Sequence, residues 1–273
     1  MPGLPRIGVL VRGESGRSRL QEGGARPRRE RPPPSVKILL FDVDGTLVRA
    51  GAAGARALDK AVERRHGVPG VCASLNFQGK TDLRNFAEAI SAATGRRATR
   101  AQVDAVHRDY LKELPRQVAV SIRGKRYELT RGIRSLLERL AVEEGVLLGL
   151  GTGNMERGAR IKLAPSGLSG FFRFGGYGSD SYHRPALLRR GVARARKLLG
   201  GKRILRRDVF VVGDTPLDVA AGRRAGYRTI AVGTGWSPWK DLIASAPDFI
   251  ARDFRDPEKW LTWIGLSKKR SQR

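Results

Sequence analysis

The chain has 273 residues, 40% of them apolar, which is enough for one large domain with an insertion or for two modest domains. No apolar run approaches the roughly 18 residues of a membrane span, and the single cysteine, Cys72, excludes a disulfide within the chain. We therefore expect no membrane partner and a reducing, cytoplasmic setting.

The formal net charge of +27 is unusually high for this length. Such a charge suits a nucleic-acid partner or the capture of anionic substrates. The basic residues are scattered, with no interleaved aromatic side chains and no known binding motif, which favours a compositional bias toward arginine. Nucleic acid is therefore a partner that we consider but do not favour, and the sequence leaves the oligomeric state open.

The two ends of the chain differ from its middle. Residues 1–35 are rich in arginine, glycine and proline and lack an apolar period, so we predict a disordered basic tail. Residues 267–273 contain four basic residues and no acid, and we expect a second loose basic end. The structured part of the protein should lie between them.

Between these ends, strand-like and helix-like segments alternate. We predict short buried strands at 36–41, 146–150, 171–175, 208–212 and 229–232. We predict helices at roughly 131–143, 155–163, 184–199 and 216–225. This alternation indicates an α/β fold, a doubly wound parallel sheet with helices on both faces. In such sheets the functional site lies beyond the carboxyl ends of the strands.

The segment from about 50 to 127 interrupts the alternation. Its pattern predicts helices at about 52–66, 82–94 and 99–118, with little strand character. Helices that merely cover the sheet are the alternative, but about 75 residues is long for a crossover. We predict an all-helical cap domain, residues 51–126, inserted into a core domain formed by residues 36–50 and 127–266.

The end of the first predicted strand carries two acids. Asp42 and Asp44 follow an apolar run and are themselves followed by a glycine and a hydroxyl. Side chains at positions i and i+2 of a strand share one face, so these carboxylates aim at one point. Two carboxylates that close repel each other unless a cation or a proton separates them. The pair predicts a Mg2+ site in which one carboxylate attacks and the other handles a proton.

Two further strand ends carry polar groups. Thr152, Gly153 and Asn154 follow the second strand just before a helix, where such groups can hold phosphate oxygens. An isolated match of this kind is more often a helix cap with a tight turn. Asp214 ends the fourth strand and Asp218 lies in the next helix, which adds a third carboxylate at the same edge. Three such strand ends on one sheet indicate a single site.

These segments resemble the haloacid dehalogenase-like (HAD) hydrolase superfamily, in its phosphatase branch. Residues 41–47 (FDVDGTL) look like the first motif of that family, 152–154 like the second and 213–218 (GDTPLD) like the fourth. The helical insertion is similar to the small cap of phosphoglycolate-phosphatase-like members, and residues 79–82 (GKTD) resemble their substrate-facing cap loop. The resemblance covers about residues 36–250 and implies a Rossmann-like core.

The resemblance also implies roles for the matched residues. Asp42 would attack phosphorus and form an aspartyl-phosphate. Asp44 would protonate the leaving alcohol and then activate water. Thr152 and the backbone N–H of Gly153 would bind the phosphate, with Asn154 beside them. Positioning and charge neutralisation are what phosphoryl transfer requires of a protein, so these roles agree with the residue types.

The metal ligands implied by the resemblance are Asp42, the Asp44 carbonyl and Asp214. Asp218 would stand just behind them. Mg2+ prefers oxygen ligands of this kind, so Mg2+ is the expected cofactor.

One motif departs from the family pattern. The third motif is usually a lysine between the nucleophile and the phosphate, and the best match in this chain is Arg184. Arginine can neutralise the same charges and bind them bidentately, although its reach and geometry differ. Lys162 and Lys197 are weaker candidates because both lie inside helical patterns. In the cap loop, Lys80 is a candidate for substrate contact.

The sequence thus predicts a Mg2+-dependent phosphomonoester hydrolase that acts on a small phosphorylated metabolite, with phosphoglycolate as the first substrate to test. A phosphomutase or phosphotransferase is an alternative, because both reactions begin with the same aspartyl-phosphate. A basic nucleic-acid-binding protein that retains the fold is a third hypothesis. The partner expected first is a small-molecule phosphate ester.

Overall fold

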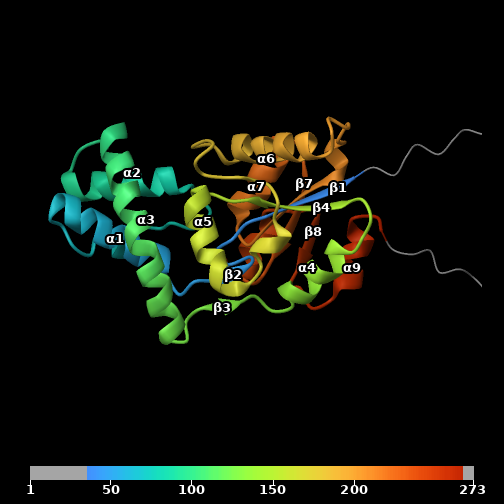
Figure 1. Cartoon of the computed structure of the whole chain (residues 1–273), viewed down its shortest axis with the longest axis horizontal. Helices are drawn as coiled ribbons and strands as arrows, with labels where there is room; N and C mark the ends of the chain where they lie inside the picture. Colours follow the sequence, from blue (N-terminus) through green and yellow to red (C-terminus); the bar gives the residue numbers. More distant parts are fainter. Residues whose placement is uncertain (1–35, 267–273) are drawn as a thin grey trace, which may run out of the picture. The chain divides into compact units, whose positions relative to one another are not determined.

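The computed structural model describes residues 36–266, and the predicted tails at 1–35 and 267–273 lie outside these residues. Figure 1 shows a parallel sheet with helices on both faces. The strands are β1 (Lys37–Phe41), β2 (Val48–Arg49), β3 (Glu128–Leu129), β4 (Val146–Gly151), β5 (Gly175–Gly176), β6 (Val209–Gly213), β7 (Arg228–Val232) and β8 (Phe249–Ala251). The helices are α1 (Ala53–His66), α2 (Asp82–Thr94), α3 (Arg100–Arg123), α4 (Ile133–Ala141), α5 (Glu156–Leu163), α6 (Arg184–Leu198), α7 (Pro216–Ala225), α8 (Trp239–Ala244) and α9 (Pro257–Trp263).

Six strands form the main sheet in the order β5-β4-β1-β6-β7-β8, and all the pairs are parallel. β1 is central, and its side chains alternate between the two faces. Leu39 and Phe41 pack with α4, α5 and α9, whereas Ile38 and Leu40 pack with α6 and α7. A strand buried on both faces must be apolar throughout, which is why β1 and β6 consist almost entirely of apolar residues. The doubly wound parallel sheet that the alternation predicted is confirmed.

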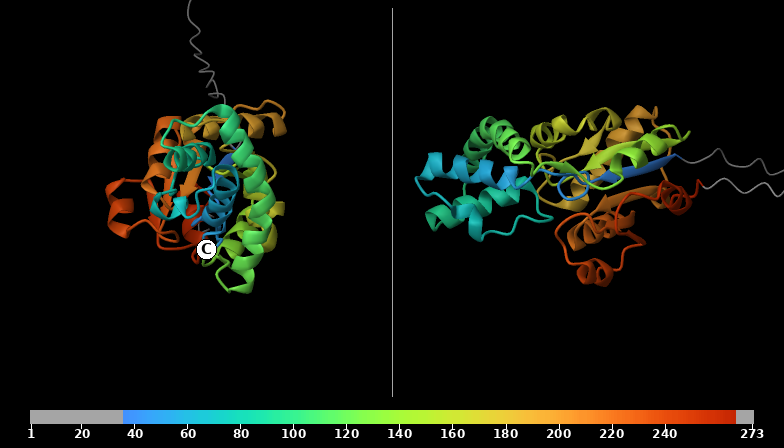
Figure 2. Two further views of the ribbon diagram at one scale, coloured as in Figure 1. Left: turned by 90° about the vertical axis from the view of Figure 1, so that its left-hand side faces the viewer. Right: turned by 90° about the horizontal axis from the view of Figure 1, so that it is seen from below.

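Helices α1, α2 and α3 form the segment inserted between β2 and β3, which we call the helical insertion. It has an apolar cluster of its own, centred on Leu58, Phe86, Ile90 and Leu114. Figure 2 shows these helices packed against one another beside the sheet. The two-residue strands β2 and β3 pair antiparallel at the base of the insertion. The cap-domain boundaries at 51–126 stay a prediction.

Most predicted elements occur within a few residues of their expected positions, but the strand predicted at 171–175 is wrong. This segment holds a short 3-10 turn at Ser169–Phe171, and only Gly175–Gly176 pairs in the sheet. Its apolar side chains, Phe172 and Phe174, reach the cores from irregular backbone. The apolar residues of this segment therefore indicated that it is buried, but they did not indicate that its backbone is extended. Strands β2, β3 and β8 and helices α8 and α9 were not predicted.

Within residues 36–266, no helix combines the length and the apolar character that crossing a bilayer requires.

The cysteine of the insertion gives a first testable prediction. Cys72 is buried, and burial raises the pKa of its thiol to about 12, with Asp59 adding to the shift. Because the thiolate is the reactive form, we expect native protein at pH 8 to react with iodoacetamide roughly 1,000-fold more slowly than a free cysteine. Intact-mass measurement checks this, since the chain has one cysteine. Rapid labelling without denaturant would contradict the burial of Cys72.

Candidate active site

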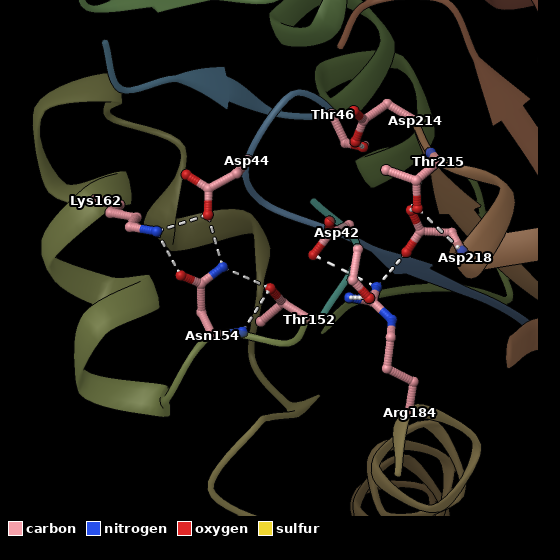
Figure 3. Close-up of polar contacts among 11 residues, drawn as sticks. Asp42, Asp44, Thr46, Thr152, Asn154, Lys162, Arg184, Asp214, Thr215 and Asp218 are labelled. Carbon is pink, nitrogen blue, oxygen red and sulfur yellow. Dashed lines mark hydrogen bonds and ion pairs between the residues drawn. The ribbon is translucent and has the colours of Figure 1, made fainter. Parts of the chain in front are cut away.

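Three parallel strands bring the predicted site residues to one edge of the sheet. β1 lies between β4 and β6, so the residues that follow these strands are neighbours. Asp42 follows β1, Thr152 follows β4 and Asp214 follows β6, and each is at least 94% buried. Figure 3 shows Asp42 between Thr152 and Asp214. The structure therefore brings these three residues together at neighbouring strand ends, and their roles stay a prediction.

Helix α7 fixes the fourth acid. Thr215 is its N-cap and accepts a hydrogen bond from the backbone N–H of Asp218, while the Asp218 carboxylate accepts from the backbone N–H of Thr215. Pro216 at the first helical position suits this start, because its φ is already helical and it has no N–H to satisfy. The capping box therefore holds Asp218 at the sheet edge.

The carboxylates of Asp42, Asp214 and Asp218 form a tight buried cluster. One oxygen from each lies within 4.8 Å of the others. Burial raises the pKa of Asp42 to about 7, although the nearby charge of Arg184 acts against this shift. Burial and the charges of Asp218 and Asp42 raise the pKa of Asp214 well above its ordinary value. Within residues 36–266, three carboxylates thus share one nearby cation, Arg184, so the cluster has an excess of negative charge.

The donor set fits a divalent metal ion. The Oδ1 atom of Asp42 is buried without a hydrogen-bond partner among the described residues. Oδ1 of Asp214 accepts one hydrogen bond from Thr46 at 3.0 Å. Asp218 differs, because one of its oxygens binds Arg184 and the other binds Thr215. Asp42 and Asp214 thus offer carboxylate oxygens with few protein partners, and with a third acid behind them they match the preference of Mg2+.

Arg184 begins α6 and is 8% exposed. Its Nη2 atom binds Asp218 and lies 3.8 Å from Oδ1 of Asp42, as the third-motif prediction requires. Its Nε atom is buried and has no partner within residues 36–266. Arg184 therefore places a positive charge beside Asp42. Its Nε–H group is a hydrogen-bond donor that a ligand could use.

Asp44 belongs to a second network on the other side of the site. Its Oδ2 accepts from Nζ of Lys162 at 2.7 Å and from the amide of Asn154 at 2.9 Å. The Asn154 amide also donates to Thr152 and accepts from Lys162 at 2.6 Å. Figure 3 shows this network opposite Arg184. The side chain of Asn154 is thus fully engaged by protein groups and orients Asp44 and Thr152.

Lys162 was ranked as a weak candidate because it lies inside a helix, yet its side chain is 6% exposed and contacts Asp44. Burial disfavours its charge, but Asp44, with Tyr110 and Asp82, raises the pKa of Lys162 above its ordinary value. One signal could have revealed it. The buried positions of α5 include 158, 159 and 163, so a lysine at 162 stands on the apolar face of its helix.

A cavity of about 600 Å3 joins the acids to the helical insertion. The predicted substrate residue Lys80 lines it, and its amine is 2.6 Å from the Glu88 carboxylate. Apolar, neutral polar and charged side chains of the insertion also line the cavity, among them Phe86, Tyr110 and Arg56. The cavity therefore has room for a small organic molecule beside the acids.

A family profile for haloacid dehalogenase-like hydrolases matches residues 36–226. This span exceeds half of the chain, and the chain belongs to that family of hydrolases. The family assignment and the enzymatic character that the motifs predicted are confirmed. A comparison with curated proteins found no match.

Solved structures share the fold. A hydrolase from Pseudomonas syringae superposes with a TM-score of 0.62 at 20% identity, covering 83% of this chain and 98% of its own. A predicted phosphoglycolate phosphatase from Haemophilus somnus gives 0.59 at 19% identity, covering 84% and 99%. A protein assigned as a beta-phosphoglucomutase, from Bacteroides vulgatus, gives 0.58 at 22% identity, covering 86% and 91%. At these identities the likeness establishes the fold.

Proposed function

We propose that the protein is a Mg2+-dependent phosphomonoester hydrolase that acts through an aspartyl-phosphate on Asp42. The observation that carries the proposal is the charge layout around this residue. A buried carboxylate oxygen of Asp42 without a hydrogen-bond partner among the described residues faces two other acids, with Arg184 at 3.8 Å. A phosphoryl group between Asp42 and Arg184 would meet a nucleophile and a cation together.

In this proposal the phosphate is held by the loop that follows β4. The hydroxyl of Thr152 accepts hydrogen bonds from Asn154, so its own proton is available to an anionic oxygen. It bonds the Asp42 carboxyl and acts to lower the pKa of that group, and a phosphate oxygen beside Asp42 could accept the same proton. The backbone N–H of Gly153 supplies a second donor. Donors preorganised in a buried site stabilise charge on the transferring group more strongly than water does.

Asp44 is the proposed general acid and then the general base. Its carboxylate is one-third exposed and lines the cavity, so it can reach a leaving oxygen or a water molecule there. Lys162 and Asn154 hold one of its oxygens, which leaves the other for the proton. In this proposal the buried acid, Asp42, is the nucleophile, and the acid that faces the cavity, Asp44, transfers the proton.

Asp42, the backbone carbonyl of Asp44 and Asp214 are the proposed ligands of Mg2+. When bound, the metal would neutralise the acids and the phosphate oxygens. Asp218 keeps Arg184 and Thr215 in place behind these ligands.

A panel of phosphate monoesters tested with Mg2+ would examine the proposal, with phosphoglycolate first because of the family resemblance. We expect release of inorganic phosphate that EDTA abolishes and Mg2+ restores. Asp214→Asn should raise the Mg2+ concentration needed for half-maximal activity at least about 10-fold, because one charged ligand is lost. Activity that persists in EDTA would contradict the proposal. Phosphorylated products that appear in place of inorganic phosphate would assign the chain to the mutase alternative.

A further inference from the structure

One loop of the helical insertion lies directly against the catalytic edge. This loop, residues 75–81, connects the 3-10 turn at Val71–Ser74 to α2. The backbone N–H of Asp82, just after it, donates to the Gly153 carbonyl at 2.8 Å. The Asp82 carboxylate accepts from the backbone N–H of Met155, also at 2.8 Å. Two hydrogen bonds thus dock the end of the loop onto the phosphate-binding turn.

Two glycines make this approach possible. A Cβ atom on Gly153 would lie 2.2 Å from the Lys80 carbonyl oxygen, so no other residue fits there without displacing the loop. Gly79 has φ of +67°, and a Cβ on it would lie 2.8 Å from the Thr215 hydroxyl. Both close approaches join the 75–81 loop to residues that surround the acids.

Arg184 binds this loop as well as the acids. Its Nη1 donates to the Gly79 carbonyl at 3.2 Å, while its Nη2 binds Asp218 and lies near Asp42. The guanidinium is planar, so contacts at both of its terminal nitrogens fix the direction of the buried Nε. A lysine at this position would have one nitrogen and could not span the loop and the acids in this way.

We propose that Arg184 couples docking of the 75–81 loop to binding of the phosphoryl group, so that each favours the other. The phosphate half of this inference rests on the proposed function, and the loop half rests on the contacts alone. Docking of the loop fixes the guanidinium, and a bound phosphate anchors that guanidinium in the orientation in which it donates to the Gly79 carbonyl. Docking of the 75–81 loop over the substrate is thereby linked to the orientation of the Arg184 guanidinium that binds the phosphate.

Hydrogen exchange of the full chain, with and without inorganic phosphate and Mg2+, tests the coupling. In the wild type, phosphate should slow amide exchange across residues 76–82. Arg184→Lys, which keeps the charge, should speed exchange of that segment at least about 10-fold without phosphate and remove most of the protection that phosphate adds. Arg189→Lys is the matched control, because Arg189 lies in the same helix, binds the Arg224 carbonyl and is exposed. It should leave exchange unchanged.

Gly153→Ala is the second variant, because it keeps the guanidinium at position 184 and adds a Cβ that would lie 2.2 Å from the Lys80 carbonyl oxygen and 3.0 Å from Nη1 of Arg184, which separates the loop from that guanidinium. It should reproduce the fast exchange at 76–82 and lower the affinity for phosphate. Unchanged exchange in Arg184→Lys, or phosphate that binds without protecting the loop, would overturn the coupling. Loss of turnover with the protection intact would instead count against the proposed reaction, so the two ideas fail separately.

Discussion

Asp42→Asn is expected to lose turnover by at least about 1,000-fold and, in the absence of metal, to be more stable than the wild type. Asparagine has the same shape but cannot attack phosphorus. The gain in stability follows from the environment of Asp42, where burial raises the carboxyl pKa to about 7 and the charges of Asp218 and Asp44 add to the shift. Removing that charge relieves repulsion within the acid cluster.

The stability effect depends on pH with a definite sign. A carboxyl whose folded pKa is raised favours the fold while protonated, and this contribution is lost as the pH rises from about 4 to about 7. We therefore expect the wild type and Asp42→Asn to unfold alike near pH 4. In EDTA at pH 8 the variant should be more stable, by a free energy of unfolding on the order of 1–3 kcal/mol. Urea unfolding at the two pH values measures the difference.

Asp109→Asn provides a control of opposite sign. A hydrogen bond from Arg65 lowers the pKa of Asp109, so its charge stabilises the fold. That variant should be less stable at pH 8 and should keep its kcat, because Asp109 lies in α3 and does not line the cavity. If Asp42→Asn also lost stability, the lost activity could be attributed to misfolding, and the picture of a repulsive acid cluster would be wrong.

The central strands could be predicted because their sequences permit little else. β1 and β6 consist almost entirely of apolar residues and are each followed by an acid, and a run of that kind suits a strand buried on both faces. The edges of the sheet carry weaker signals. β5 has two residues, both glycine, and β8 has three. Such strands are defined by the neighbour they pair with, which a single segment of sequence does not reveal.

The residues of the site also fall into those that could be predicted from the sequence and those that could not. Asp42, Thr152 and Asp214 follow from the rule that parallel strands end at one edge. The partners of these residues do not, because they depend on side-chain directions in folded helices. Lys162 lies inside a helical pattern, and that pattern alone does not show that its side chain contacts Asp44. The amide of Asn154 was predicted to contact the phosphate, whereas in the structure it binds protein groups.

Lys162→Met is the second substitution for which we expect a large effect. It removes the amine that lies 2.7 Å from Asp44 and 2.6 Å from the Asn154 carbonyl oxygen, while the methionine fills a similar volume. Among the described residues, Asp44 then keeps only the Asn154 amide as a side-chain partner, and Asn154 itself loses the amine that orients it. We expect kcat to fall about 100-fold with a small change in KM, because the residue orients an acid and does not touch the phosphate. Steady-state kinetics on any substrate found in the panel would measure this split.

Stability should also fall, and more at high pH than at low pH. Burial raises the pKa of Asp82 to about 6, and the charge of Lys162 acts against that shift. Without the lysine, an ionised Asp82 is buried with less compensation, so the free energy of unfolding should drop by about 2–4 kcal/mol at pH 8. Near pH 5 most of Asp82 is protonated in the folded protein, and the loss should be smaller.

Two further variants separate a specific role of Lys162 from a general need for charge. Lys197→Met is the matched control, because Lys197 also lies inside a helix but is exposed, and it should leave both kcat and stability unchanged. Lys162→Arg should fail to restore activity. Nζ of Lys162 is already 3.1 Å from the position that a Cβ on Gly54 would occupy, so the larger guanidinium would press against α1. Full activity in Lys162→Arg would show that the site needs only a positive charge there, whereas failure of both Lys162 variants would identify the amine and its position as what holds Asp44.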